Sequence, residues 1–148
     1  VSGGYLAQEK DSIKSDFDNL NVVTKKEPNQ DELEALKLGW KIVRYVKSNA
    51  IVIANSNQIL GVGAGQMSRI DSVKIAIRKI KEFNLNLDNS IMASDAFFPF
   101  PDSLELAARY GIKSVIQPGG SRSDNEVIEI ADKLGMSMIF TSVRHFYH

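Results

Sequence analysis

The sequence predicts an α/β fold in which a mixed β-sheet is sandwiched between helices. Two observations predict it. Short apolar runs rich in β-branched residues alternate with longer segments whose apolar residues recur every three or four positions. In addition, the later apolar runs each lead through a turn into a helix start. Strands that alternate with helices form largely parallel sheets that those helices cover.

The N-terminal 28 residues are the least regular part of the chain. We expect short strands at residues 5–7 and 20–24 and a polar surface loop over residues 10–21. Residues 1–28 are therefore predicted to form N-terminal strands and a loop, and residues 29–148 the core. The 148 residues, with 43% hydrophobic content and no visible linker, suit a single domain over residues 1–148.

The first long helix is predicted over residues 30–47. Its apolar stripe recurs at three- and four-residue steps and comprises Leu33, Leu36, Trp40, Val43 and Val46. Gly39 lies inside this helix, where glycine costs up to about 1 kcal/mol relative to alanine. We interpret it as a point of close packing.

A β-hairpin and a second helix come next. Two apolar runs, residues 50–54 and 59–63, flank a turn sequence at residues 55–58. The helix begins after Ser68, whose hydroxyl is expected to cap it together with Asp71 three residues on. Its predicted buried face comprises Ile70, Val73, Ile77 and Ile80.

Two further strand-to-helix units and a last strand complete the pattern. The run at residues 91–93 leads through the aromatic turn SDAFFPFPD (residues 94–102) into a helix from Asp102. The run at residues 113–116 leads through Pro-Gly-Gly-Ser into a helix capped by Ser123, and the final strand covers residues 136–141. In such sheets the carboxyl ends of strands meet at one edge, and ligands bind there.

Three loops on that edge are candidate ligand sites. Residues 61–69 resemble a dinucleotide-binding loop only superficially, because Gln66 replaces the last glycine of G-x-G-x-x-G. The glycines there serve either tight turning or the approach of a ligand beside Arg69. The aromatic turn either packs inside or grips a flat ligand. The Pro-Gly-Gly-Ser loop at residues 118–121 is typical of a cradle for an anion or a polar ligand.

The last five residues, Arg-His-Phe-Tyr-His at 144–148, hold both histidines of the chain. Histidine suits proton transfer near neutral pH, and Arg144 is suited to fork onto a phosphate. The alternative is a frayed terminus. A metal site is disfavoured, because no cysteine or acidic cluster accompanies His145 and His148.

Composition argues against several function classes. Eighteen basic and eighteen acidic residues cancel, which disfavours nucleic acid as a partner. No apolar run approaches the roughly 20 residues that span a bilayer, so no membrane partner is expected. The chain has no cysteines, which excludes thiolate chemistry and fits a cytoplasmic location.

Five ordered segments carry a resemblance to a known family: KSNAIV (47–52), GVGAGQMSR (61–69), SDAFFPFPD (94–102), PGGSRSDNEVI (118–128) and RHFYH (144–148). Together they resemble the AICAR formyltransferase domain of the bifunctional AICAR formyltransferase/IMP cyclohydrolase family of purine biosynthesis. AICAR is 5-aminoimidazole-4-carboxamide ribonucleotide. VSGG (1–4) and VVTK (22–25) extend the match over essentially the whole chain.

The resemblance implies formyl transfer from the co-substrate 10-formyltetrahydrofolate to the amino group of AICAR, with no metal. It also implies a cytidine-deaminase-like, three-layer α-β-α sandwich and a homodimer in the complete protein. The chain corresponds to the C-terminal subdomain of the transferase domain. The family's catalytic Lys-His pair and its cyclohydrolase domain belong to upstream segments, so the isolated chain is expected to be inactive.

The resemblance also assigns residue roles. On the AICAR side it places Asn49, Phe97, Arg144, Phe146 and His148, with Arg144 on the phosphate and Asn49 and His148 assisting the reaction. On the folate side it places Arg69, Asp102, Ser121 and Arg122. Arg122 and Pro101 depart from the residues usual in the family. The other interpretation is a non-catalytic nucleotide-binding module, or an excised fragment with no independent activity.

Overall fold

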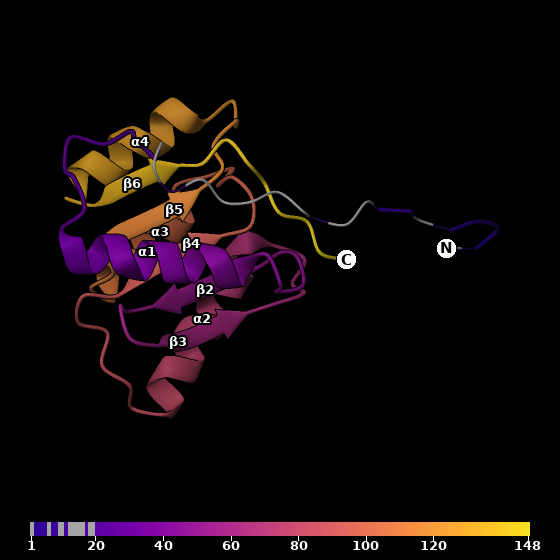
Figure 1. Cartoon of the computed structure of the whole chain (residues 1–148), viewed down its shortest axis with the longest axis horizontal. Coiled ribbons are helices and arrows are strands. Elements are labelled where there is room, and N and C mark those ends of the chain that lie inside the picture. Colours follow the sequence, from indigo (N-terminus) through magenta and orange to yellow (C-terminus); the bar gives the residue numbers. More distant parts are fainter. Residues whose placement is uncertain (1, 6, 9–10, 12–16, 18–19) are drawn as a thin grey trace.

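The computed structural model describes residues 2–5, 7–8, 11, 17 and 20–148 and contains a six-stranded sheet with helices on both faces (Figure 1). The strands are β1 (Asn21–Val22), β2 (Ile51–Ala54), β3 (Ile59–Gly63), β4 (Ile91–Ser94), β5 (Ser114–Gln117) and β6 (Ser137–Phe140). The helices are α1 (Gln30–Val43), α2 (Arg69–Glu82), α3 (Asp102–Arg109) and α4 (Asp124–Lys133). The predicted α/β class is confirmed.

The sheet is mixed, with strand order β1-β6-β5-β4-β2-β3. β2 pairs antiparallel with β3, as the hairpin predicts, and also antiparallel with β4. β4, β5 and β6 pair in parallel, and β1 pairs antiparallel with β6. Because β2 opposes both of its neighbours, β3 points in the same direction as β4, β5 and β6. The carboxyl ends of these four strands therefore gather at one edge, where the candidate ligand loops were predicted.

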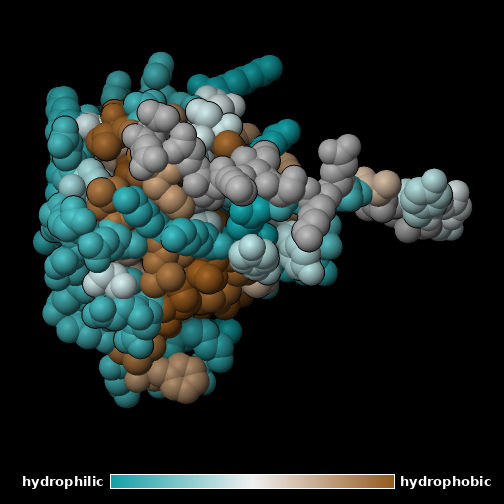
Figure 2. Space-filling model, in the orientation of Figure 1, coloured by the Kyte–Doolittle hydropathy of each residue, from teal (hydrophilic) through white to brown (hydrophobic). Residues whose placement is uncertain are grey.

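Alternation of side chains along the strands builds one apolar core on each face of the sheet. Val52 and Ala93 belong to the core beneath α1, whereas Ile51 and Met92 belong to the core beneath α2, α3 and α4. The result is the predicted three-layer α-β-α sandwich, in which α1 is the one described helix on its face of the sheet (Figure 1). Figure 2 shows apolar side chains beside α1, over β2 and β3, and Val62 on β3 is 36% exposed.

Close contact between α2 and β3 explains the glycines of β3. A Cβ atom on Gly63 would lie 1.9 Å from the carbonyl oxygen of Ser72, and one on Gly61 would lie 2.5 Å from that of Ala76. Both obstacles are backbone atoms of α2. These two glycines therefore serve helix packing, which was neither of the two alternatives considered from the sequence. Gly65 fits the turning interpretation, since its φ is +66°.

Helix α1 is shorter than predicted but packs as predicted. It ends at Val43 instead of residue 47, because the chain tightens into a turn in which the N–H of Val46 donates to the carbonyl of Val43 at 3.0 Å. Within the helix, a Cβ atom on Gly39 would lie 2.9 Å from Cδ1 of Ile91 and 3.1 Å from Cβ of Ala93. The close packing inferred from this glycine is confirmed.

Side chains cap two of the described helices, α1 and α2, whereas α3 and α4 have no side-chain cap. α1 begins with a capping box between Asn29 and Glu32, which the sequence interpretation missed. Ser68 caps α2 by accepting from the N–H of Asp71 at 3.3 Å, although the Asp71 carboxylate binds the Ser68 hydroxyl and leaves the box incomplete. The predicted cap at Ser123 is wrong, because this residue has φ −94° and ψ 8° and not the extended backbone that directs a capping side chain.

The N-terminal predictions are confirmed only in part. The strand expected at residues 20–24 forms as the shorter β1. Tyr5 and Ala7 lie outside any strand, and residue 6, like most of the expected loop over residues 10–21, lies outside the described residues. None of the helices in the described ranges combines the length and the apolar character needed to cross a lipid bilayer.

Candidate functional site

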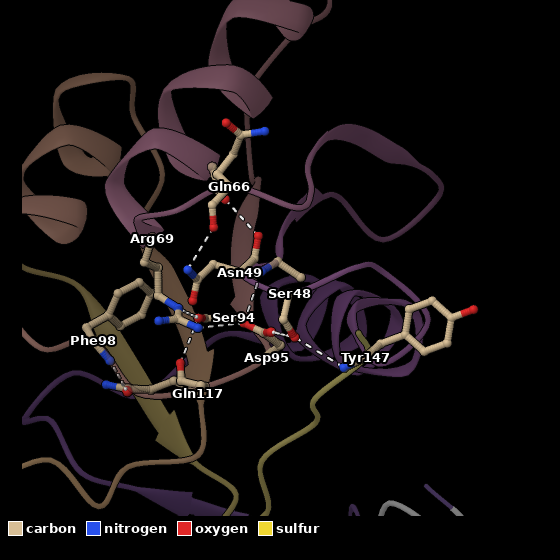
Figure 3. Close-up of polar contacts among 12 residues, drawn as sticks. Ser48, Asn49, Gln66, Arg69, Ser94, Asp95, Phe98, Gln117 and Tyr147 are labelled. Atoms are coloured by element: carbon tan, nitrogen blue, oxygen red, sulfur yellow. Dashed lines mark hydrogen bonds and ion pairs between the residues drawn. The ribbon is translucent and has the colours of Figure 1, made fainter. Parts of the chain in front are cut away.

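A buried carboxylate, Asp95, connects several segments at the carboxyl edge of the sheet (Figure 3). It directly follows β4 and is 1% exposed. Its side chain accepts hydrogen bonds from the Ser48 hydroxyl at 2.6 Å, the Ala50 N–H at 3.1 Å and Nη2 of Arg69 at 2.7 Å. Its backbone carbonyl accepts from the N–H of His145 at 2.8 Å. Residues far apart in the sequence therefore meet at one side chain.

Arg69, the first residue of α2, lies along the end of β4. Its Nε donates to the hydroxyl of Ser94 at 2.8 Å, and its Nη2 forms the ion pair with Asp95. The side chain is only 9% exposed. The guanidinium is thus held in place by side chains of the protein itself.

One cavity of about 430 Å³ lies between the loop before α2 and the second half of the aromatic turn, and we name it the Asp102 cavity. It is lined by Asn49, Met67, Ser68, Arg69, Ile70, Pro99, Phe100, Asp102 and Ser103. The side-chain amide of Asn49 is oriented by donating to the carbonyl of Gln66 at 2.8 Å. Asp102 is exposed, and one of its carboxylate oxygens accepts from the N–H of Ser103 at 2.7 Å. This carboxylate can therefore also face a ligand in the cavity.

A second cavity, of about 330 Å³, begins at the other end of the aromatic turn, and we name it the Arg144 cavity. It is lined by Phe97, Pro118, Gly119, Gly120, Ser142 and Arg144. Arg144 is exposed, and its guanidinium carbon lies 5.0 Å from the centre of the Phe146 ring. A planar cation beside an aromatic ring at the mouth of a cavity is suited to bind a phosphate.

The loop at residues 118–121 does not form the open cradle that its sequence suggested. The N–H groups of Gly120 and Ser121 donate to the carboxylate of Asp124 at 2.7 and 3.1 Å. The loop instead shapes the wall of the Arg144 cavity. Gly119 has φ +72°, and a Cβ atom there would lie 2.5 Å from the ring of Phe140, so this position requires glycine.

Residues 144–148, which we name the tail, are docked on the body of the protein. The N–H of Ser48 donates to the carbonyl of Tyr147 at 2.9 Å, and the N–H of Tyr147 donates to the Ser48 hydroxyl at 3.2 Å. The ring of His145 is buried, with its centroid 4.6 Å from that of Trp40 and its Nδ1 bonded to Asp11. The frayed-terminus alternative is wrong, because the tail makes these specific contacts.

The exposed rings of the tail line a third cavity. The rings of Phe146 and His148 stack with centroids 5.7 Å apart. The cavity measures about 340 Å³ and is lined by Gln8, Asp11, Arg44, Tyr45, Phe146, Tyr147 and His148. Buried His145 therefore anchors the tail, while its neighbours on either side remain exposed.

The structure groups most of the predicted site residues, although not always as predicted. Arg69 and Asp102 share the Asp102 cavity, and Phe97 and Arg144 share the Arg144 cavity. Asn49, predicted on the AICAR side, lies with Arg69 and Asp102. Within the described lining of the Asp102 cavity, Ser121 and Arg122 are not found. The three phenylalanines of the aromatic turn have separate places: Phe97 lines the Arg144 cavity, Phe98 is fully buried, and Phe100 is 64% exposed beside Asp102.

Sequence reasoning missed Asp95 and Ser48 as site residues. Asp95 is one of two acids in the aromatic turn, and the sequence alone favoured the exposed one at position 102. The available signal was its place directly after the apolar run of β4, where a charged side chain needs partners if it is buried. Ser48 carried no comparable signal.

Asp71, in the first turn of α2, has a perturbed carboxylate. The Ser68 hydroxyl and, to a lesser degree, the Lys74 ammonium bind the Asp71 carboxylate and lower its pKa below the ordinary value. In the ranges that the structure describes, no three His, Asp or Glu side chains converge in a way that would hold a metal ion.

Comparisons with known proteins agree on one family and one fold. The sequence model of the family described as AICARFT/IMPCHase bienzyme matches residues 1–79. The chain is 52% identical over 148 residues to the bifunctional purine biosynthesis protein PurH of Aquifex aeolicus and 53% identical to that of Bacillus mycoides. It is covered completely in both alignments but spans only 29% and 28% of the two relatives.

A solved structure supports the fold separately. The apo dCMP deaminase from the cyanophage S-TIM5 matches with a TM-score of 0.50 at 17% identity, covering 72% of this chain and 94% of that chain. This likeness shows the deaminase-like arrangement of sheet and helices.

Proposed function

The chain belongs to the AICARFT/IMPCHase bienzyme family of purine biosynthesis, and from this premise we propose that it supplies part of the site at which a formyl group passes from 10-formyltetrahydrofolate to AICAR. The upstream half of the same domain would supply the catalytic Lys-His pair. The complete protein would act as a homodimer.

The observation that carries this proposal is the position of the aromatic turn between two cavities. Phe97 at its start lines the Arg144 cavity, and Asp102 at its end lines the Asp102 cavity. Arg144 provides a forked cation for the AICAR phosphate, and Asp102 provides a carboxylate for the polar edge of a pterin. Two ligands held on either side of one rigid turn suit a reaction that joins them.

The chemistry needs orientation more than it needs a strong nucleophile from this chain. The AICAR amine attacks the formyl carbon, a new C–N bond forms, and the bond between that carbon and folate N10 breaks. The amine loses one proton, and N10 gains one. Holding two reactants in contact accelerates such a step strongly, and the proton transfer is assigned to the upstream residues.

A second candidate is a binding module that holds a phosphorylated nucleotide without catalysis. The Arg144 cavity favours it, because the phenylalanine, the arginine and the glycine loop all come from this chain. An excised fragment with no independent activity is the remaining alternative.

Formyl transfer measured with and without the upstream half distinguishes these functions. We expect no turnover by the 148-residue chain alone, binding of AICAR in calorimetry, and turnover when the separately produced upstream half is added. Binding without any restored turnover would favour the binding module. Absence of AICAR binding in both samples would contradict the proposal.

Replacing Arg144 with alanine is expected to weaken AICAR binding by about 1.5–3 kcal/mol, the range for a hydrogen bond to a charged group. In the full-length protein this corresponds to a rise in the dissociation constant of about 10- to 150-fold. Calorimetry measures it, with Arg109→Ala, an exposed arginine at the end of α3, as the matched control. An unchanged AICAR affinity in Arg144→Ala would show that the phosphate binds elsewhere.

Replacing Asp102 with asparagine is expected to impair the use of folate more than that of AICAR. The carboxamide keeps the size of the side chain but removes one acceptor and the negative charge, so KM for 10-formyltetrahydrofolate should rise about tenfold or more. Steady-state kinetics on the full-length protein measures this, and Asp88→Asn, an exposed acid before β4, is the control. The reverse pattern, with AICAR affected more, would mean that the two ligand assignments are exchanged.

A further inference from the structure

We propose that Asp95 is a positioning residue that sets the geometry of both candidate ligand cavities at once. The inference rests on the proposed function and extends it to a side chain that lines neither the Asp102 cavity nor the Arg144 cavity. Asp95 would act through Arg69 on one side and through the tail on the other.

The burial of Asp95 is the first step of the argument. Its carboxylate is almost completely removed from solvent and accepts three hydrogen bonds, from Ser48, Ala50 and Arg69. Burying a charge costs free energy unless hydrogen-bonding partners are held beside it. Removing the charge in turn leaves those buried partners, Arg69 above all, without compensation, which also costs free energy. The two segments that donate to Asp95, residues 48–50 and the start of α2, are therefore both constrained by it.

The connection to the Asp102 cavity runs through Arg69 and Asn49. One oxygen of Asp95, Oδ1, accepts from both Arg69 and the N–H of Ala50. Arg69 lines the Asp102 cavity directly, and Asn49, the neighbour of Ala50, lines it from the opposite segment. Figure 3 shows Asp95 close to the guanidinium of Arg69, with Asn49 in the same cluster. This single oxygen thus fixes the two segments that line the cavity relative to each other.

The connection to the Arg144 cavity runs through Ser48 and the backbone. The other oxygen, Oδ2, accepts from the Ser48 hydroxyl, which itself accepts from the N–H of Tyr147. The carbonyl of Asp95 accepts from the N–H of His145, next to Arg144. Asp95 and Ser48 therefore hold the backbone of the tail at His145 and Tyr147, on both sides of Phe146. We infer that they also fix the backbone from which the Arg144 side chain extends.

An asparagine at position 95 cannot reproduce this arrangement. If its oxygen remains toward Arg69 and Ala50, its NH₂ group faces the Ser48 hydroxyl, which must then accept instead of donate while still accepting from Tyr147. If it is flipped, the NH₂ group faces two donors. In either orientation the charge opposite the 9% exposed Arg69 side chain is lost.

Asp95→Asn in the full-length protein tests the proposal with two independent measurements. Steady-state kinetics is expected to show KM raised at least about tenfold for both AICAR and 10-formyltetrahydrofolate. Hydrogen–deuterium exchange is expected to be at least about tenfold faster in a peptide covering the tail. Asp88→Asn is the matched control and should change neither. A purely structural role would instead reduce the active fraction and leave both KM values as in the unmodified protein.

Ser48→Ala is the milder second variant, in case Asp95→Asn does not fold. It removes the link between Oδ2 and Tyr147 and leaves the Arg69 pair in place, so it should raise KM for AICAR more than KM for the folate and accelerate exchange in the tail. Unchanged exchange in both variants, or a change in only one KM for Asp95→Asn, would overturn the proposal. Exchange needs no ligand, so if the unmodified protein transferred no formyl group, faster exchange would still support the hold of Asp95 on the tail.

Discussion

Replacing Gly63 with alanine is expected to lower the free energy of unfolding by about 3 kcal/mol or more. The new Cβ would lie 1.9 Å from the carbonyl oxygen of Ser72 and 2.6 Å from its Cα atom. These are backbone atoms of α2, so no side-chain rotation relieves the clash and the helix must move away from β3. Overpacking a core usually costs about 1–3 kcal/mol, and displacing a whole helix belongs at or above the upper end of that range.

Urea denaturation followed by circular dichroism measures this effect. Val62→Ala is the matched control, since Val62 immediately precedes Gly63 in the same strand and is partly exposed. It should lower the free energy of unfolding far less. If the free energy of unfolding of Gly63→Ala lay within about 1 kcal/mol of that of the unmodified protein, the contact between α2 and β3 would be looser than described. A variant that no longer unfolds cooperatively would agree with the prediction.

Replacing Trp40 with alanine is expected to lower the free energy of unfolding by about 3–5 kcal/mol, the range for removing a large buried aromatic side chain. Trp40 is 2% exposed and belongs to the core beneath α1. It also packs against the ring of His145, which anchors the tail. The substitution should therefore lower overall stability and also loosen the tail, so that AICAR binding weakens in molecules that remain folded.

Thermal unfolding and calorimetry separate these two effects of Trp40→Ala. Phe83→Ala serves as the control, because Phe83 is a large aromatic residue that is 67% exposed after α2. It should change the melting temperature little and leave AICAR affinity unchanged. A Trp40 variant with unaltered AICAR affinity would show that the contact with His145 does not position the tail.

Most of the fold followed from residue periodicity. The helix stripe through Trp40 and the apolar runs of β2 to β6 are local patterns of apolar residues. Such patterns can be read from the sequence because each element must bury its apolar side chains. Element ends followed less well, because they depend on distant contacts. The end of α1 at Val43 and the cap of α4 are decided by the path of the chain into the next element and by local backbone conformation.

The candidate site was predictable in its location but not in its internal bonds. The direction of the strands placed the loops of Arg69 and Asp102 at one edge, and the motifs marked Phe97 and Arg144. The sequence of a loop, however, does not show which of its N–H groups already have a hydrogen-bond acceptor within the protein. The N–H of Gly120, for example, donates to the carboxylate of Asp124. The glycines of β3 show the same limit. The sequence does not distinguish a glycine required by a helix packed on the strand from a glycine required by a ligand.

The pairing of β1 with β6 sets an order in which the molecule is expected to assemble. It joins Asn21 to Phe140 and so closes a loop over most of the chain, and the entropy of closing a loop grows with its length. The β2–β3 hairpin and α2 are neighbours in sequence and can form early, whereas non-local strand pairs slow folding. The contacts between the tail and Ser48 also join residues far apart in the sequence, so docking of the segment that carries Arg144 is expected among the late steps of folding. A nucleotide that binds the tail would therefore act on the late steps of folding.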